Sequence, residues 1–187
     1  MLQHQRQIIA HKLDAMKIAV HGDYHLGQVL NTGKDFVIID LEGESRRSLG
    51  ERALKRSPLV DVSSMMRSFD YAGNVALARQ RPEDAPLLQP WMDYWVKTIR
   101  AVFLQAYLEV TSAAPLFPRN ETDFAVLLET LLFDRAVHEV VYELTYRIEL
   151  VGIPLRAIAR TLAPVGLTQE KADAAGEPEA VTSTGSI

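Results

Sequence analysis

A short polar loop followed by a β-hairpin pattern constrains the fold of this chain more than any other feature. The loop covers residues 21–28 (HGDYHLGQ), and an apolar run at residues 36–39 leads into Asp40. Between them, residues 31–35 (NTGKD) form a cluster typical of a turn, which predicts a hairpin with strands at 29–30 and 36–41. Such a hairpin brings Gln28 and Asp40 together and leaves Asp23 on the loop just before it.

Two carboxylates and an amide oxygen that converge in this way suit Mg²⁺-assisted phosphoryl transfer. In that chemistry Gln28 and Asp40 hold the metal, and Asp23 accepts the proton of the attacking hydroxyl. Asp23 as a mere turn residue is the alternative. His21 and His25 flank Asp23, so a His-x-Asp-x-His metal site is a further interpretation.

These motifs resemble those of maltokinases, which belong to the aminoglycoside-phosphotransferase and protein-kinase-like superfamily. The resemblance rests on residues 21–28, 39–44 (IDLEGE), 55–62 (KRSPLVDV) and 66–72 (MRSFDYA), and it extends from about His21 to Ile158. It implies the C-terminal lobe of a kinase that transfers phosphate from ATP to maltose with Mg²⁺ as cofactor, in trehalose and glycogen metabolism. Maltokinases are often fused to trehalose synthase, so a fused trehalose synthase domain is an implied partner.

The resemblance also implies roles for individual residues. Asp23 and His21 would be the catalytic pair, with His21 fixing the loop, and Gln28 and Asp40 would bind ATP and Mg²⁺. Asp61, at the start of the next helix, would support the loop backbone, although it could simply favour that helix terminus. The implied sugar contacts are His25, Glu42, Tyr142, Glu143 and Arg147.

Several positions leave these implied roles open. Gln28 stands where most of the superfamily has Asn, and Glu42 could be merely solvated. His138 and residues 146–150 (YRIEL) depart from the maltokinase pattern, which has a Trp near the latter stretch, so maltose specificity is open. A kinase for aminoglycosides, choline or another small alcohol is therefore an alternative, as is a non-catalytic interaction module. A two-metal phosphoesterase is excluded because no later Asn-His pair follows.

Apolar periodicity predicts a mainly α-helical chain around the small hairpin. Three prolines predict a loop over residues 79–90, and the segment 42–56 reads as a surface connection. The basic residues of this segment could neutralise phosphate charge or could simply be solvated. They are Arg46, Arg47, Arg52, Lys55 and Arg56. The aromatic residues Trp91, Tyr94 and Trp95 are expected in the core rather than on a sugar platform.

The predicted helices cover residues 2–19, 57 onward, 91–112, 120–144 and 153–162. Ser57 is the expected N-cap of the second helix, with Pro58 at its first position, and Asn120 is the expected cap of the fourth. The expected buried face of the second helix is Val62, Met65, Met66 and Phe69, and the apolar stripe of the fourth is Phe124, Leu127, Leu128, Leu131, Leu132, Val137, Val140, Val141 and Leu144.

Only 22 residues precede Asp23, too few for the sheet that covers nucleotide phosphates in kinases of this type, and no Gly-x-Gly pair is present. We therefore expect residues 1–166 to form a C-terminal lobe whose N-terminal lobe is absent, followed by a disordered tail at 167–187. The chain alone should be inactive and should expose an apolar patch where the missing lobe docks.

Composition limits the remaining possibilities. A net charge of −4 gives no electrostatic reason to expect a nucleic-acid partner, and no apolar run is long enough to cross a membrane. The chain has no cysteine, which excludes disulfides and thiolate metal sites. Without a signal-peptide pattern, the cytoplasm is the expected location.

Overall fold

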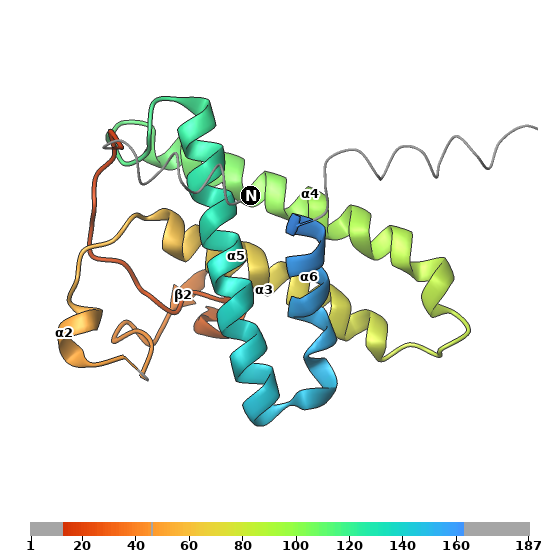
Figure 1. Ribbon diagram of the computed structural model, residues 1–187. Coiled ribbons are helices and arrows are strands. Elements are labelled where there is room, and N and C mark those ends of the chain that lie inside the picture. The colour runs from red at the N-terminus through yellow and green to blue at the C-terminus, as the bar shows by residue number, and fades with distance from the viewer. Residues whose placement is uncertain (1–12, 46, 163–187) are drawn as a thin grey trace, which may run out of the picture.

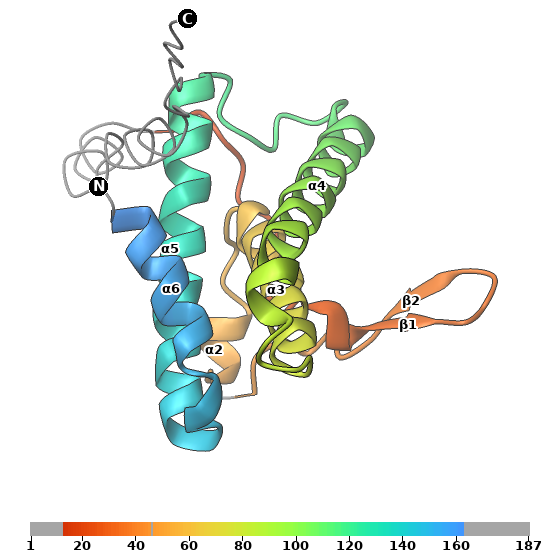
Figure 2. The same ribbon diagram turned by 90° about the vertical axis from the view of Figure 1, so that its right-hand side faces the viewer.

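The computed structural model describes residues 13–45 and 47–162. It is mainly helical, as predicted, with one two-stranded sheet. Helix α3 lies between α4 on one side and α5 on the other, α6 packs against α5, and the hairpin projects from one end of this assembly (Figures 1 and 2). The elements are η1 (Leu26–Gln28), β1 (Val29–Asn31), β2 (Phe36–Ile38), α2 (Leu49–Arg52), α3 (Leu59–Ala78), α4 (Ala85–Thr111), α5 (Glu121–Tyr146), η2 (Ile148–Leu150) and α6 (Gly152–Leu162).

The predicted hairpin is present. Strands β1 and β2 pair antiparallel, with Val29 opposite Ile38 and Asn31 opposite Phe36. The turn uses Gly33 at a positive φ of 82°, a conformation that glycine adopts without steric cost. Strand β2 ends at Ile38 rather than residue 41, because the backbone of Asp40 turns to a φ of 61° and leaves the strand direction.

The predicted helix at 2–19 is wrong over the part that the structure describes. Residues 13–20 are not helical, and Ile18 instead forms an antiparallel bridge with Arg56 through N–O contacts of 2.8 and 2.9 Å. In a helix, the N–H and C=O groups of Ile18 would form hydrogen bonds within the same helix. Here both groups bond to Arg56 instead. Residues 2–12 lie outside the described part of the chain.

The hydrophobic core lies between α3 and the first half of α5. Leu59, Val62 and Met66 of α3 are buried against Leu128 of α5, with aromatic side chains from α4 and α5 around them. The predicted apolar face of α3 is therefore present, and so is the first half of the predicted α5 stripe. The second half is wrong, since Val137, Val141 and Leu144 are exposed.

Helix α4 differs from the prediction in its start and in its buried face. It begins at Ala85, because Pro86 occupies the first turn, where no backbone N–H is needed, although Pro90 lies inside the helix. The side chains of Trp91, Tyr94 and Trp95 are 70%, 68% and 46% exposed, so their expected place in the core is wrong. The single buried residue of α4 is Val96, which faces α3.

The remaining elements show how local signals set helix boundaries. Asn120 caps α5 as predicted, its side-chain oxygen accepting from the N–H groups of Thr122 and Asp123. Helix α3 begins one residue later than expected for a Pro58 start, with Ser57 Oγ accepting from the N–H of Leu59. The short helix α2, with a Ser48–Glu51 capping box, was not predicted. Helix α6 matches the prediction, and the expected tail at 167–187 lies outside the described residues.

None of the helices within residues 13–45 and 47–162 is long and apolar enough to cross a membrane.

Candidate active site

The first turn of α3 anchors the polar loop before the hairpin by hydrogen bonds to the loop backbone. The Asp61 carboxylate accepts hydrogen bonds from the backbone N–H groups of His21 and Gly22, at 2.7 and 2.8 Å. Gly22 has a φ of 81°, which favours glycine at this position. One carboxylate on a rigid helix therefore fixes two consecutive peptide groups of the loop.

His21 ties the same loop to the hairpin. Its Nε2 donates to the carbonyl oxygen of Ile39 at 2.8 Å, so Nδ1 is left as the acceptor for the backbone N–H of Asp23 at 3.4 Å. Both ring nitrogens are thus engaged with backbone groups. This arrangement makes His21 a positioning residue and speaks against a metal site that uses His21 as ligand.

Asp23 lies at the centre of the loop and is 23% exposed. Its Oδ1 accepts from Nη2 of Arg135 at 3.1 Å, and its Oδ2 lies 3.8 Å from Nε2 of His25. Nδ1 of His25 accepts from the N–H of Gly27. Burial lowers the pKa of His25, and the nearby Asp23 opposes this only in part, so the ring is neutral at neutral pH.

Arg135 was not predicted as a site residue. It lies on α5, 112 residues from Asp23 in sequence. Its spacing in the sequence could have identified it. Arg135 stands seven residues, or about two helical turns, after Leu128 and therefore lies on the apolar face of α5. A charged residue at such a position is expected to have a buried partner.

Gln28 and Asp40 meet at the base of the hairpin, as the turn pattern predicted. Nε2 of Gln28 donates to Oδ2 of Asp40 at 2.8 Å, and the backbone N–H of Ile39 donates to the Gln28 carbonyl at 3.0 Å. Among the described residues, no group of three or more His, Cys, Asp or Glu side chains is arranged to hold a metal. Any ion here would therefore rest on the mixed amide and carboxylate pair.

The predicted sugar contacts on α5 form a separate cluster, about two turns beyond Arg135. Glu143 is 1% exposed and accepts from Tyr71 Oη at 3.0 Å and from Arg147 Nη2 at 2.8 Å. The Arg147 guanidinium lies 4.9 Å from the ring centre of Tyr142. Burial and the Glu143 carboxylate raise the pKa of Tyr71. Glu42, the remaining predicted contact, is exposed on the loop after the hairpin.

The fold is similar to that of kinase-like proteins over part of their length. The chain is similar to three solved structures titled glucosamine kinase, one of them in complex with glucosamine, ADP and inorganic phosphate. For that complex the TM-score is 0.68 with 26% identity, over 80% of this chain and 34% of the other. The two further crystal forms give TM-scores of 0.66 and 0.67 at 25% and 26% identity, over 80% and 79% of this chain and 35% and 33% of theirs.

A curated relative is the glucosamine kinase of Streptacidiphilus jiangxiensis. It is 29% identical over 147 residues, which are 76% of this chain and 32% of the relative. The chain therefore spans about a third of the length of the proteins it matches. No protein-family model matches the sequence.

Proposed function

We propose that this chain supplies the catalytic lobe of an ATP-dependent sugar kinase. The observation that carries the proposal is the loop itself, which presents Asp23 beside the Gln28–Asp40 pair. The similarity to glucosamine kinases supports it, because one of the solved structures holds glucosamine together with ADP and inorganic phosphate. In this proposal the nucleotide phosphates are covered by a further segment that this chain does not supply.

In this proposal Asp23 orients the acceptor hydroxyl and takes its proton as the phosphoryl group is transferred. Arg135 holds Oδ1 of Asp23 at 3.1 Å, which leaves Oδ2 to face the acceptor. His25 is neutral and near Oδ2, so it can donate a hydrogen bond without competing for the proton. Asp61 and His21 keep the loop in place during the reaction.

Gln28 and Asp40 would hold Mg²⁺ in the same proposal. The two side chains already meet at 2.8 Å, and rotation of the Gln28 amide would place its oxygen beside the Asp40 carboxylate. Two side-chain oxygens suit Mg²⁺, which usually keeps several waters and binds nucleotide phosphates through its other positions. When bound, the ion would neutralise charge on the transferred phosphate.

The acceptor is proposed to be a sugar, with maltose and glucosamine as the two to compare. Maltose follows from the motif resemblance, and glucosamine from the names of the relatives. Tyr142 and Arg147 are accessible enough to touch a sugar, with side chains 39% and 43% exposed. Glu143 is buried and paired with Arg147, so its proposed role is to orient that guanidinium.

The remaining partner is a nucleotide-binding lobe, supplied by sequence outside this chain. The hairpin is its proposed docking surface, because Phe36, Val37 and Leu41 are exposed there. A cytoplasmic location and fusion to trehalose synthase stay predictions from the sequence.

A chimera tests the proposal. The matched segment of the S. jiangxiensis glucosamine kinase is replaced by the corresponding residues of this chain, and ATP-dependent phosphorylation of maltose, glucosamine, choline and an aminoglycoside is measured. We expect transfer to a sugar. Asp23→Asn should reduce turnover by about 10²–10⁴-fold while Mg²⁺-nucleotide affinity persists. Asp40→Asn should reduce both the turnover and the Mg²⁺-nucleotide affinity.

Two outcomes would contradict this assignment. A folded chimera that binds Mg²⁺-ATP but transfers phosphate to no acceptor would favour the non-catalytic interaction module. Equal loss of nucleotide affinity in Asp23→Asn and Asp40→Asn would mean that Asp23 is a metal ligand rather than the base.

A further inference from the structure

A positively charged pocket lies beside the candidate site, between the start of α3 and the middle of α5. Its volume is about 320 Å³. The residues that line it come from four separate parts of the chain, including Gly22 of the loop. Five of its side chains carry a permanent positive charge and one is a carboxylate, and these are Lys17, Arg47, Lys55, Arg56, Arg135 and Asp134.

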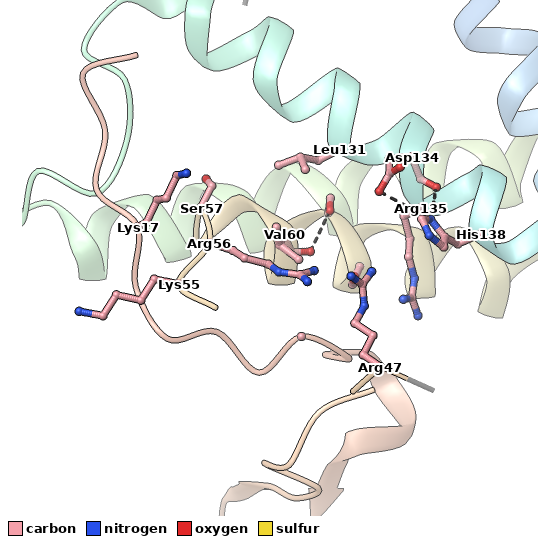
Figure 3. A pocket seen from close by; sticks show the side chains of 13 residues that line it. Lys17, Arg47, Lys55, Arg56, Ser57, Val60, Leu131, Asp134, Arg135 and His138 are labelled. Atoms are coloured by element: carbon pink, nitrogen blue, oxygen red, sulfur yellow. Dashed lines mark hydrogen bonds and ion pairs between the residues drawn. The ribbon is translucent and has the colours of Figure 1, made fainter. Parts of the chain in front are cut away.

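The guanidinium groups of this pocket share one space. Figure 3 shows Arg47 and Arg56 extending between the loop segment and the helices, with Arg135 entering from α5, whereas Lys55 points away. The backbone of Arg56 is anchored by its bridge to Ile18. Arg47 is held by Glu44 at 2.7 Å. The guanidinium groups of Arg47 and Arg135 are therefore oriented by carboxylates before any ligand arrives.

The positive charge in the pocket is only partly balanced by the protein. Arg47 and Arg135 each have one carboxylate partner, Glu44 and Asp23, which do not line the pocket. Lys17, Lys55 and Arg56 form no ion pair with the described residues. The positive end of the α3 dipole adds to the field, because Ser57 and Val60 at its start line the same wall. The pocket therefore attracts anions.

We propose that this pocket binds a phosphate group, either free or carried on a sugar. Guanidinium groups match phosphate oxygens with two parallel hydrogen bonds, and three of them around one space suit a dianion better than a single carboxylate. The volume accommodates a phosphate with a small organic group attached. Arg135 links the pocket to the candidate base, since the same guanidinium contacts Asp23. All of the lining residues named here belong to this chain, so phosphate binding can be measured without assuming the kinase proposal.

Calorimetric titration of the 187-residue chain tests the binding. The probes are inorganic phosphate, glucose 6-phosphate and glucose as the uncharged control. Both phosphates should bind and glucose should not, with affinity falling as sodium chloride is added. Tighter binding of glucose 6-phosphate identifies a phosphorylated sugar as the ligand, and equal binding identifies the phosphate group alone. Binding of neither phosphate overturns the proposal.

A pair of matched double variants locates the site. Arg47→Gln/Arg56→Gln removes two pocket guanidiniums, and Arg79→Gln/Arg81→Gln removes two exposed ones elsewhere. The match is close because Arg81 pairs with Asp84 three residues away, just as Arg47 and Glu44 are three residues apart. The first variant should weaken phosphate affinity at least about tenfold, since it removes charge-assisted hydrogen bonds to the phosphate. The second should not change it.

A second measurement uses the unchanged chain, so its result does not depend on whether the variants fold. Phosphate titration followed by NMR should shift the backbone amide signals of Gly22, Val60 and Ser63, which line the pocket. The amide of Gly33 at the hairpin turn should stay unchanged. Equal phosphate affinity in the two double variants, or shifts confined to the hairpin, overturns the proposal.

Discussion

At the scale of single residues, the buried charge of Arg67 is the most consequential feature of the interior. Its side chain is 3% exposed and pairs with Asp70 of α3 and Glu139 of α5, with Nε–Oε2 at 3.1 Å to the latter. Burial alone would lower the pKa of Arg67, but the two carboxylates outweigh it and raise that pKa. Arg67 therefore keeps its positive charge inside the protein.

Replacing Arg67 should be costly. Arg67→Met leaves two largely buried carboxylates unpaired, so we expect the free energy of unfolding to fall by about 3–5 kcal/mol. Urea denaturation measures it. Arg81→Met is the matched control, because that arginine is 74% exposed and also pairs with an acid three residues away, and its effect should stay within about 0.5 kcal/mol. Equal effects would mean that the buried pairing contributes nothing.

His25 should make stability depend on pH. Because burial lowers its pKa below the ordinary value of 6.5, its contribution is present above that value and is lost as pH falls through the lowered pKa. The free energy of unfolding should therefore be smaller at about pH 5.5 than at about pH 7.5. In His25→Asn, which keeps an acceptor for the N–H of Gly27, this difference should shrink. An unchanged pH dependence would contradict this reading of His25.

At the scale of elements, Gly73 sets how closely α3 and α4 approach. A Cβ at this position would lie 2.9 Å from Cγ2 of Val96 and 3.1 Å from Sδ of Met92. Alanine favours helices over glycine by up to about 1 kcal/mol, but overpacking a close contact costs about 1–3 kcal/mol. The cost of overpacking should therefore exceed the gain in helix propensity, so an alanine at this position should destabilise the protein.

Two glycine substitutions separate these terms. Gly73→Ala should lower the midpoint of thermal unfolding. Gly50→Ala in α2, where a Cβ meets nothing within 4 Å, should leave the midpoint unchanged or raise it. Circular dichroism on both variants measures the difference. A stabilised Gly73→Ala would show that α4 can move away from α3 at little cost.

At the scale of the whole molecule, the exposed hairpin is the feature that sets solution behaviour. Phe36 is 67% exposed, Val37 46% and Leu41 73%, all on or next to a two-stranded sheet that has no further strand among the described residues. Apolar sheet edges of this kind favour association. The chain should therefore bind a hydrophobic dye and self-associate as its concentration rises.

Substitutions on the hairpin test whether this surface is responsible. Phe36→Thr/Val37→Thr should reduce dye fluorescence and shift sedimentation toward the monomer. Leu49→Thr/Leu87→Thr removes apolar side chains that are 77% and 71% exposed on α2 and α4, and it should have a smaller effect. Monomeric behaviour of the unchanged chain without dye binding would contradict a docking surface at the hairpin.

Features that depend on neighbouring residues could be predicted from the sequence alone. The turn at 31–35 determined the hairpin and so the meeting of Gln28 with Asp40. The cap at Asn120 likewise acts within three residues. Each of these depends on hydrogen bonds and backbone preferences within a short stretch, and such interactions are encoded locally.

Other features were decided only when distant segments packed together. Residues 13–20 are not helical because Ile18 pairs with Arg56, and apolar periodicity does not predict such pairing. Periodicity also does not tell which face of α4 meets α3, so Trp91 and Trp95 were misplaced. Arg135 reaches Asp23 across 112 residues, and the positively charged pocket gathers cations from four segments. Contacts of this kind follow from the packing of the helices, which no short stretch of sequence specifies.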